Sequence, residues 1–130
     1  GWQARPRIDF EGALAAAVER ERWVIDGNYF GLSARRLARA DLIVMLDYPR
    51  AVTFRRVVKR IAQWRGRVRP DSAAGCPEQL DLGFLWYVWR WQATKRPRWL
   101  EIVAPHRDRA VQLTGDAEVE QLVAALRLAS

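Results

Sequence analysis

The sequence predicts an α/β domain in which a small parallel β-sheet is flanked by helices. Three short strand candidates carry this prediction, at residues 23–25, 42–46 and 110–113. The first two are apolar throughout, as strands buried on both faces of a sheet are. Segments with helical periodicity separate the three candidates, and strands that alternate with helices are typical of a parallel sheet. The 130 residues fit a single domain, residues 1–130.

The helices are predicted from apolar spacing and end signals. A first helix is expected over residues 9–21, where Asp9 is a good N-cap. Residues 65–77 contain two Gly, two Pro and three Arg, which indicates a mobile loop. After Gly115, apolar residues recur at helical spacing and predict a closing amphipathic helix. The remaining helices are expected at 33–39, at 50–64, from 77 or 78 to about 95, and at 96–106 past a break at Pro97.

The charge of the chain favours an anionic partner. The formal net charge is +7, from 22 Lys and Arg against 15 Asp and Glu. Nucleotide phosphate, nucleic acid or an acidic surface would suit it, and the arginine fork suits bidentate phosphate contacts. A GC-rich genome would give the same arginine excess. No apolar run approaches the roughly 20 residues that span a bilayer, so no membrane partner is expected. The absence of a signal-like N-terminal stretch predicts the cytoplasm.

Two acids follow the first two predicted strands. Ligands of open α/β sheets bind beyond the carboxyl ends of the strands, where Asp26 and Asp47 fall. A carboxylate there can hold Mg²⁺ directly or through water, and Gly27 would let the backbone approach a ligand closely. The alternative is that Asp26 to Asn28 is simply a turn and that Asp47 caps the helix after Pro49. Taken alone, each acid favours this alternative.

Arginines follow the second predicted strand. Arg56 and Arg60 lie four residues apart, hence on one helix face, and Arg65, Arg67 and Arg69 follow in the loop. Arginines on a helix and a hinged loop can close over a polyphosphate and neutralise its charge. A solvated basic surface is the alternative.

A basic, aromatic segment suggests a different function. Tryptophans and arginines alternate in it, as in surfaces that stack on the bases of single-stranded nucleic acid. Packing of these rings on a core is the favoured alternative, especially for Trp89. The segment runs from Arg55 to Trp99 and includes Trp86, Trp89, Trp91, Arg90, Arg96 and Arg98.

The order of these features resembles the adenylate-kinase-like branch of P-loop kinases, in particular the bacterial family often called DNA topology modulation proteins. The resemblance covers essentially the whole chain. Its most specific part is the string Trp-Val-Ile-Asp-Gly-Asn-Tyr at 23–29. The other matching features are Trp2, Ala40 to Pro49 with its Asp-Tyr-Pro ending, the Arg56 and Arg60 pair, Arg69 to Asp71, Gly75 to Glu78, Phe84, Leu85 and Trp89.

The resemblance implies an ATP- and Mg²⁺-dependent nucleotide kinase-like site in a three-layer fold. It implies that Asp26 lies near Mg²⁺, through water, and acts in catalysis with Arg56 and Arg60. These three side chains are then expected to converge on one polyphosphate-sized hollow. The remaining implied roles are Gly27, Asn28 and Tyr29 on the phosphate-acceptor side, Arg65, Arg67 and Arg69 in a lid at about 65–77, and Gly115 near the base.

The sequence departs from this family in one large respect. Such proteins begin with a strand and a Gly-x-x-x-x-Gly-Lys-Ser/Thr loop that cradles phosphates, and no such motif occurs here. The resemblance therefore implies the C-terminal three-quarters of an incomplete fold, with phosphoryl transfer confined to a full-length form. The family's first strand lies between those ending at Asp26 and Asp47. Either these two strands pair directly, or another chain, such as a second copy in a homo-oligomer, fills the gap. A structural remnant without a site is the remaining hypothesis.

Overall fold

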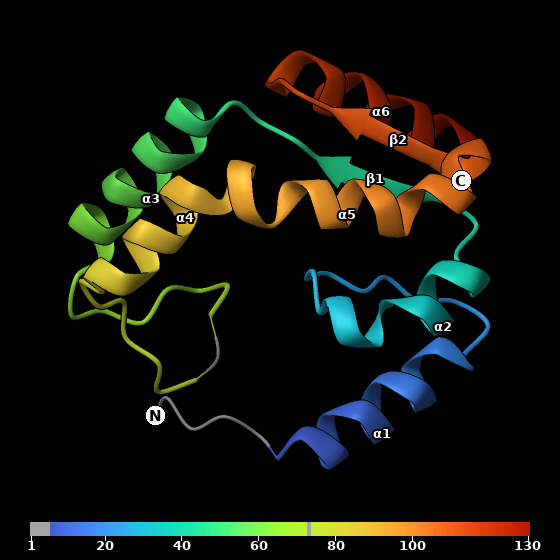
Figure 1. Cartoon of the computed structure of the whole chain (residues 1–130), viewed down its shortest axis with the longest axis horizontal. Coiled ribbons are helices and arrows are strands. Elements are labelled where there is room, and N and C mark those ends of the chain that lie inside the picture. The colour runs from blue at the N-terminus through green and yellow to red at the C-terminus, as the bar shows by residue number, and fades with distance from the viewer. Residues whose placement is uncertain (1–5, 73) are drawn as a thin grey trace.

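The computed structural model describes residues 6–72 and 74–130 and shows a mostly helical α/β arrangement around a two-stranded parallel sheet (Figure 1). Strand β1 (Ile43–Leu46) pairs with β2 (Ala110–Leu113), and Ile43 lies opposite Ala110. The predictions of a parallel sheet and of strands at 42–46 and 110–113 are confirmed. Trp2, part of the family resemblance, lies outside the described residues.

The core lies on one face of β1. Ile43 and Met45 are buried, whereas Val44 and Leu46 are exposed, as expected when side chains alternate between the faces of a strand. Helix α5 (Arg96–Val103) runs along the buried face, where Val103 joins the core cluster. Helix α6 (Asp116–Ala129) lies alongside β2, as Figure 1 shows. The apolar run of β1 is thus buried on one face only.

Two helices have the predicted bounds, α2 (Ser33–Arg39) and α3 (Arg50–Trp64). Helix α4 (Leu82–Thr94) packs against α3 but starts later than predicted, because the Asp81 carboxylate caps it by accepting from the Phe84 amide. Pro97 lies in the first turn of α5, where a missing N–H costs little, so it starts this helix and does not interrupt it.

The remaining helical segments are α1 (Arg7–Val18) and two 3₁₀ helices, Phe30–Leu32 and Ala104–Arg109. The predicted N-cap of the first helix, Asp9, is wrong. Helix α1 begins at Arg7, so Asp9 lies in its first turn, where a carboxylate favours the helix dipole. None of the described helices is long and apolar enough to cross a bilayer.

The predicted strand at 23–25 does not form. Trp23 packs against the core, but Val24 is 98% exposed and the run pairs with no described strand. A three-residue strand has too little stability of its own to persist without a partner. Since β1 pairs only with β2 among the described residues, the first of the two alternatives, direct pairing of the strands ending at Asp26 and Asp47, is wrong.

Candidate functional site

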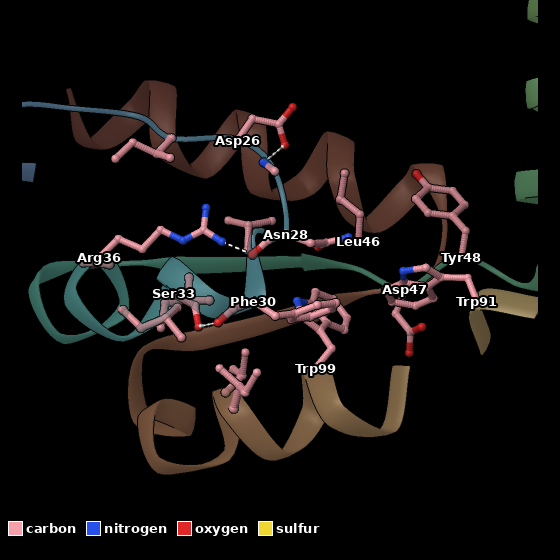
Figure 2. Close-up of a pocket in the computed structure, with 18 of the residues that line it drawn as sticks. Asp26, Asn28, Phe30, Ser33, Arg36, Leu46, Asp47, Tyr48, Trp91 and Trp99 are labelled. Carbon is pink, nitrogen blue, oxygen red and sulfur yellow. Dashed lines mark hydrogen bonds between the residues drawn. The ribbon is translucent and has the colours of Figure 1, made fainter. Parts of the chain in front are cut away.

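A cavity of about 410 Å³ opens between the turn at 26–28 and the unpaired side of β1 (Figure 2). Its volume lies within the roughly 300–1,000 Å³ range of small-molecule sites. One part of its wall is apolar and aromatic, with Trp23, Trp91 and Trp99. The polar part of the wall consists of Asp26, Asn28, Ser33, Arg36, Asp47, Tyr48, Arg50, Thr53 and Gln92.

The turn at the mouth of the cavity depends on glycine. The Asp26 carboxylate accepts a hydrogen bond from the Gly27 amide at 2.7 Å. Gly27 has φ 108°, and a Cβ there would overlap the ring of Tyr29. Tyr29 is itself left-handed, with φ 35°. The chain bends at Gly27, and this bend places Asp26 and Asn28 on the cavity wall. Backbone strain of this kind clusters at ligand sites.

Arg36 is a cavity residue that sequence reasoning missed. Its guanidinium is buried and donates a hydrogen bond to the Asn28 carbonyl (Figure 2). The guanidinium carbon also lies 5.8 Å from the centre of the Tyr29 ring. Burial lowers the pKa of Arg36, and the nearby Tyr29 and Asp26 oppose this change. Arginine keeps its proton in proteins, so this is a buried cation at one end of the cavity. No sequence signal separates it from Arg35, which is exposed.

Asp47 lies on the cavity wall beside the end of β1. Arg96 donates to its two oxygens at 2.7 to 2.9 Å, and Gln112 donates at 2.6 Å. The hydrogen bonds from Arg96 hold the pKa of Asp47 below its ordinary value. The helix-cap interpretation of Asp47 is wrong, because α3 begins after Pro49 and has no side-chain cap. The carboxylate instead ties β1 to α5 and β2.

Arg56 belongs to a cluster that touches the cavity only through a tyrosine. Asp116 accepts from Arg56 at 2.6 Å and from the Tyr48 hydroxyl at 2.7 Å, and Arg56 lies 4.7 Å from the centre of the Tyr48 ring. The hydrogen bond to Asp116 raises the pKa of Tyr48, and the one from Arg56 lowers the pKa of Asp116. Tyr48 lines the cavity, whereas Arg56 does not.

The other predicted site residues lie away from the cavity. Arg60 and Arg69 form ion pairs with Glu78, and Gly115 is the N-cap of α6. The described residues that line the cavity do not include Arg60, Arg65, Arg67, Arg69 or Gly115. The expected convergence of Asp26, Arg56 and Arg60 on one hollow is therefore not seen.

The described residues offer limited support for a metal ion. They contain no group of three or more His, Cys, Asp or Glu that could hold one. Mg²⁺ is commonly held by one or two carboxylates together with the phosphates of a ligand. Exposed Asp26 fits such a role through water, whereas the oxygens of Asp47 are already engaged by Arg96 and Gln112.

Comparison of the chain with protein-family models, curated proteins and solved structures finds no match. The cavity combines a buried cation, an exposed carboxylate and three indole rings. This combination suits a ligand that has a phosphate at one end and a flat ring at the other.

Proposed function

We propose that the chain is the acceptor-side part of a P-loop kinase-like nucleotide-binding protein and that its cavity binds a nucleoside monophosphate. The observation that carries the proposal is the arrangement along the cavity. The Arg36 guanidinium lies at one end, and the rings of Tyr48 and Trp91 lie at the other (Figure 2). A nucleotide that lies along β1 would place its phosphate against Arg36 and its base among the aromatic rings.

The charge at the Arg36 end supports a phosphate. Arg36 donates a hydrogen bond to the neutral carbonyl of Asn28. Asp26 is the acid that affects the pKa of Arg36 electrostatically, and it is exposed at the mouth of the cavity. A buried guanidinium without a close carboxylate is stabilised by an anion, and a phosphate forms strong charge-assisted hydrogen bonds with it. The indoles of Trp91 and Trp99 lie edge to face with centres 5.5 Å apart and offer an aromatic wall to the base.

ATP-dependent phosphoryl transfer is proposed only for a protein that also carries the phosphate-binding loop. The 130 residues contain no Gly-x-x-x-x-Gly-Lys-Ser/Thr motif, so nothing here supplies its amides, lysine and hydroxyl. We expect these residues to bind nucleotide without transferring phosphate. In a protein that carries such a loop, Asp26 would hold Mg²⁺ through water, and the metal would supply charge neutralisation at the transferred phosphate.

The open edge of β1 supports the proposed fold and links it to oligomeric state. An unpaired strand edge is a template for another strand. The family resemblance expects a central strand between residues 23–25 and β1, which is where the cavity lies. A strand from a second copy would fill the same space as a nucleotide. Any oligomer formed through this edge should therefore dissociate when nucleotide is added, which sedimentation velocity would measure.

Tryptophan fluorescence tests nucleotide binding, because three indoles line the cavity. We expect AMP to quench the emission and adenosine to bind at least tenfold more weakly, since adenosine lacks the phosphate. Arg36→Lys should lower the affinity for AMP but leave the affinity for adenosine unchanged. Asp26→Asn should remove any Mg²⁺ dependence, and Asp41→Asn, at another exposed acid, is the matched control. Equal binding of AMP and adenosine would refute the proposal.

A second candidate function is binding of single-stranded nucleic acid by α4. Trp86 is 61% exposed and Trp89 is 41% exposed, so the expectation that Trp89 is a core residue is not met. Arg90 lies 5.7 Å from the Trp86 ring centre, and Arg50 lies 5.1 Å from that of Trp89. Basic side chains over exposed indoles are typical of base-stacking surfaces.

Two measurements separate this second function from the first. Affinity for a single-stranded oligonucleotide should fall steeply with salt concentration, because phosphate contacts release counterions. Trp86→Ala should weaken this binding while leaving AMP affinity unchanged, and Leu128→Ala, at another exposed apolar residue, is the control. Oligonucleotide binding that does not respond to salt or to Trp86→Ala would exclude α4 as the surface.

A further inference from the structure

A second, smaller cavity lies where α1 packs against α2 and the 3₁₀ helix before it. Its volume is about 240 Å³, which is below the roughly 300–1,000 Å³ of drug-sized sites, so it suits a ligand smaller than a nucleotide. Much of its wall is apolar. The apolar lining residues are Leu14, Ala15, Val18, Leu32 and Ala34.

Helical spacing produces the apolar wall on the α1 side. Leu14 and Val18 lie four residues apart, hence on one face of α1, and Val18 is only 1% exposed. Ala15 borders the same hollow, and its small side chain leaves the hollow open. Ala16 lies on the opposite side of the helix and is exposed. A larger side chain at position 15 would therefore fill the cavity, whereas one at position 16 would point to solvent.

Three charged residues complete the wall, and two of them are neutralised by partners that do not line the cavity. Glu11 accepts a hydrogen bond from Arg7 at 2.6 Å. Arg35 donates to Glu19 at 2.5 Å. The third charged residue is Arg36, so the charge that these pairs leave uncompensated in the cavity is that of its guanidinium.

Arg36 lines this cavity as well as the larger one, so it lies between them. It is buried, its hydrogen bond goes to the neutral Asn28 carbonyl, and no carboxylate of the described residues forms an ion pair with it. A buried guanidinium in this situation favours an anionic partner, and the planar arginine fork matches the two oxygens of a carboxylate. An apolar hollow beside one such cation suits a ligand with a hydrocarbon tail and a charged end.

We propose that the cavity between α1 and α2 binds a short-chain aliphatic carboxylate. The carboxylate would pair with Arg36, and the hydrocarbon tail would lie between the two helices against Leu14 and Val18. This site takes a different ligand class from the larger cavity and uses different apolar residues, so the inference does not depend on the function proposed above.

Titration of the wild-type chain with acetate, butyrate and hexanoate, followed by amide chemical shifts in NMR spectra, tests the ligand class. Each buried methylene should raise the affinity about fourfold, so hexanoate should bind at least tenfold more tightly than butyrate. Hexanol has the same tail without the charge and should bind at least tenfold more weakly than hexanoate. Equal affinities along the acid series, or for hexanol and hexanoate, would overturn the proposal.

Two matched pairs of variants test the location. Ala15→Leu fills the cavity and should weaken hexanoate binding at least tenfold, whereas Ala16→Leu adds the same side chain on the exposed side of α1 and should leave it unchanged. Arg36→Gln should weaken hexanoate binding at least tenfold relative to Arg35→Gln, which removes the same charge from the same wall.

Circular dichroism checks the fold of each variant, and the arginine pair decides if Ala15→Leu does not fold. Unchanged hexanoate affinity in a folded Ala15→Leu variant would place the ligand in the larger cavity and overturn the proposal. An equal loss in the two arginine variants would mean that only the overall charge matters, which would overturn it as well.

Discussion

Replacement of Arg96 by Ala would leave a buried carboxylate without its counter-charge. The Asp47 side chain is 4% exposed and receives three hydrogen bonds from Arg96, at 2.7 to 2.9 Å. After the replacement, Gln112 would remain as its close side-chain donor, at 2.6 Å. Because these contacts join the end of β1 to α5, the change should lower the stability of the whole fold.

The expected loss follows from the burial of the two partners. Removal of one partner of a fully buried pair costs about 3–5 kcal/mol. The Arg96 side chain is 32% exposed, so water can partly solvate the space it leaves. We therefore expect a loss of about 2–3 kcal/mol, a large share of the roughly 5–15 kcal/mol that stabilises a domain. Asp47→Asn with Arg96→Ala should cost less than the sum of the single changes, with a coupling of at least about 1 kcal/mol.

Urea unfolding followed by circular dichroism would measure this double-mutant cycle. Arg98→Ala is the matched control, because Arg98 is an exposed arginine on the same helix. It should change stability by no more than about 0.5 kcal/mol. A coupling between Asp47 and Arg96 below about 0.3 kcal/mol would refute the reasoning, since independent sites add within that range. An equal loss on replacing Arg98 would refute it as well.

Three further predictions concern pH, turn geometry and a tyrosine. Because the folded pKa of Asp47 lies below the ordinary value of 3.8, its stabilising effect is present above that pH and is lost as pH falls through the lower folded value. The stability advantage of the wild type over Asp47→Asn should then shrink in urea unfolding at pH 3, and an unchanged gap would contradict it. Gly27→Ala should cost more than about 1 kcal/mol in thermal unfolding, because its φ is positive and its Cβ meets a ring, whereas Gly12→Ala inside α1 should gain about 0.5–1 kcal/mol. Asp116→Asn should lower the phenol pKa of Tyr48 in an ultraviolet titration, and no change would mean that their hydrogen bond is absent in solution.

Local periodicity was sufficient to predict much of the fold. Residues 42–46 form a continuous apolar run, and apolar residues recur at helical spacing over 50–64. The predicted strand and the predicted helix both form at these positions. The run at 23–25 is equally apolar but forms no strand, because a strand depends on a partner that the local pattern does not reveal. Helix α4 starts late because Asp81 caps its N-terminus. In the sequence, Asp81 is a weaker signal for the start of a helix than Pro77 and Glu78, which precede it.

The candidate site was only partly predictable. The turn from Asp26 to Asn28 can be predicted from the sequence, because an acid and a glycine follow an apolar run there. Which arginine is buried depends on how α2 packs, and the sequence treats Arg36 like its neighbours. Helical spacing placed Arg56 and Arg60 on one face of α3. It could not reveal that distant acids, at positions 116 and 78, engage them separately.

The pairing of β1 with β2 has a consequence for the rate of folding. Val44 lies opposite Val111, so the sheet joins two positions that are sixty-seven residues apart in the sequence. Most of the other contacts between elements join elements that are neighbours in the sequence. Closing such a loop costs about 4 kcal/mol of chain entropy before any strand pairing repays it. The helical hairpin of α3 and α4 can therefore form early, whereas the sheet cannot form until β2, in the last quarter of the chain, has docked against β1. Refolding should show helical signal before the tryptophan environment of the core is established.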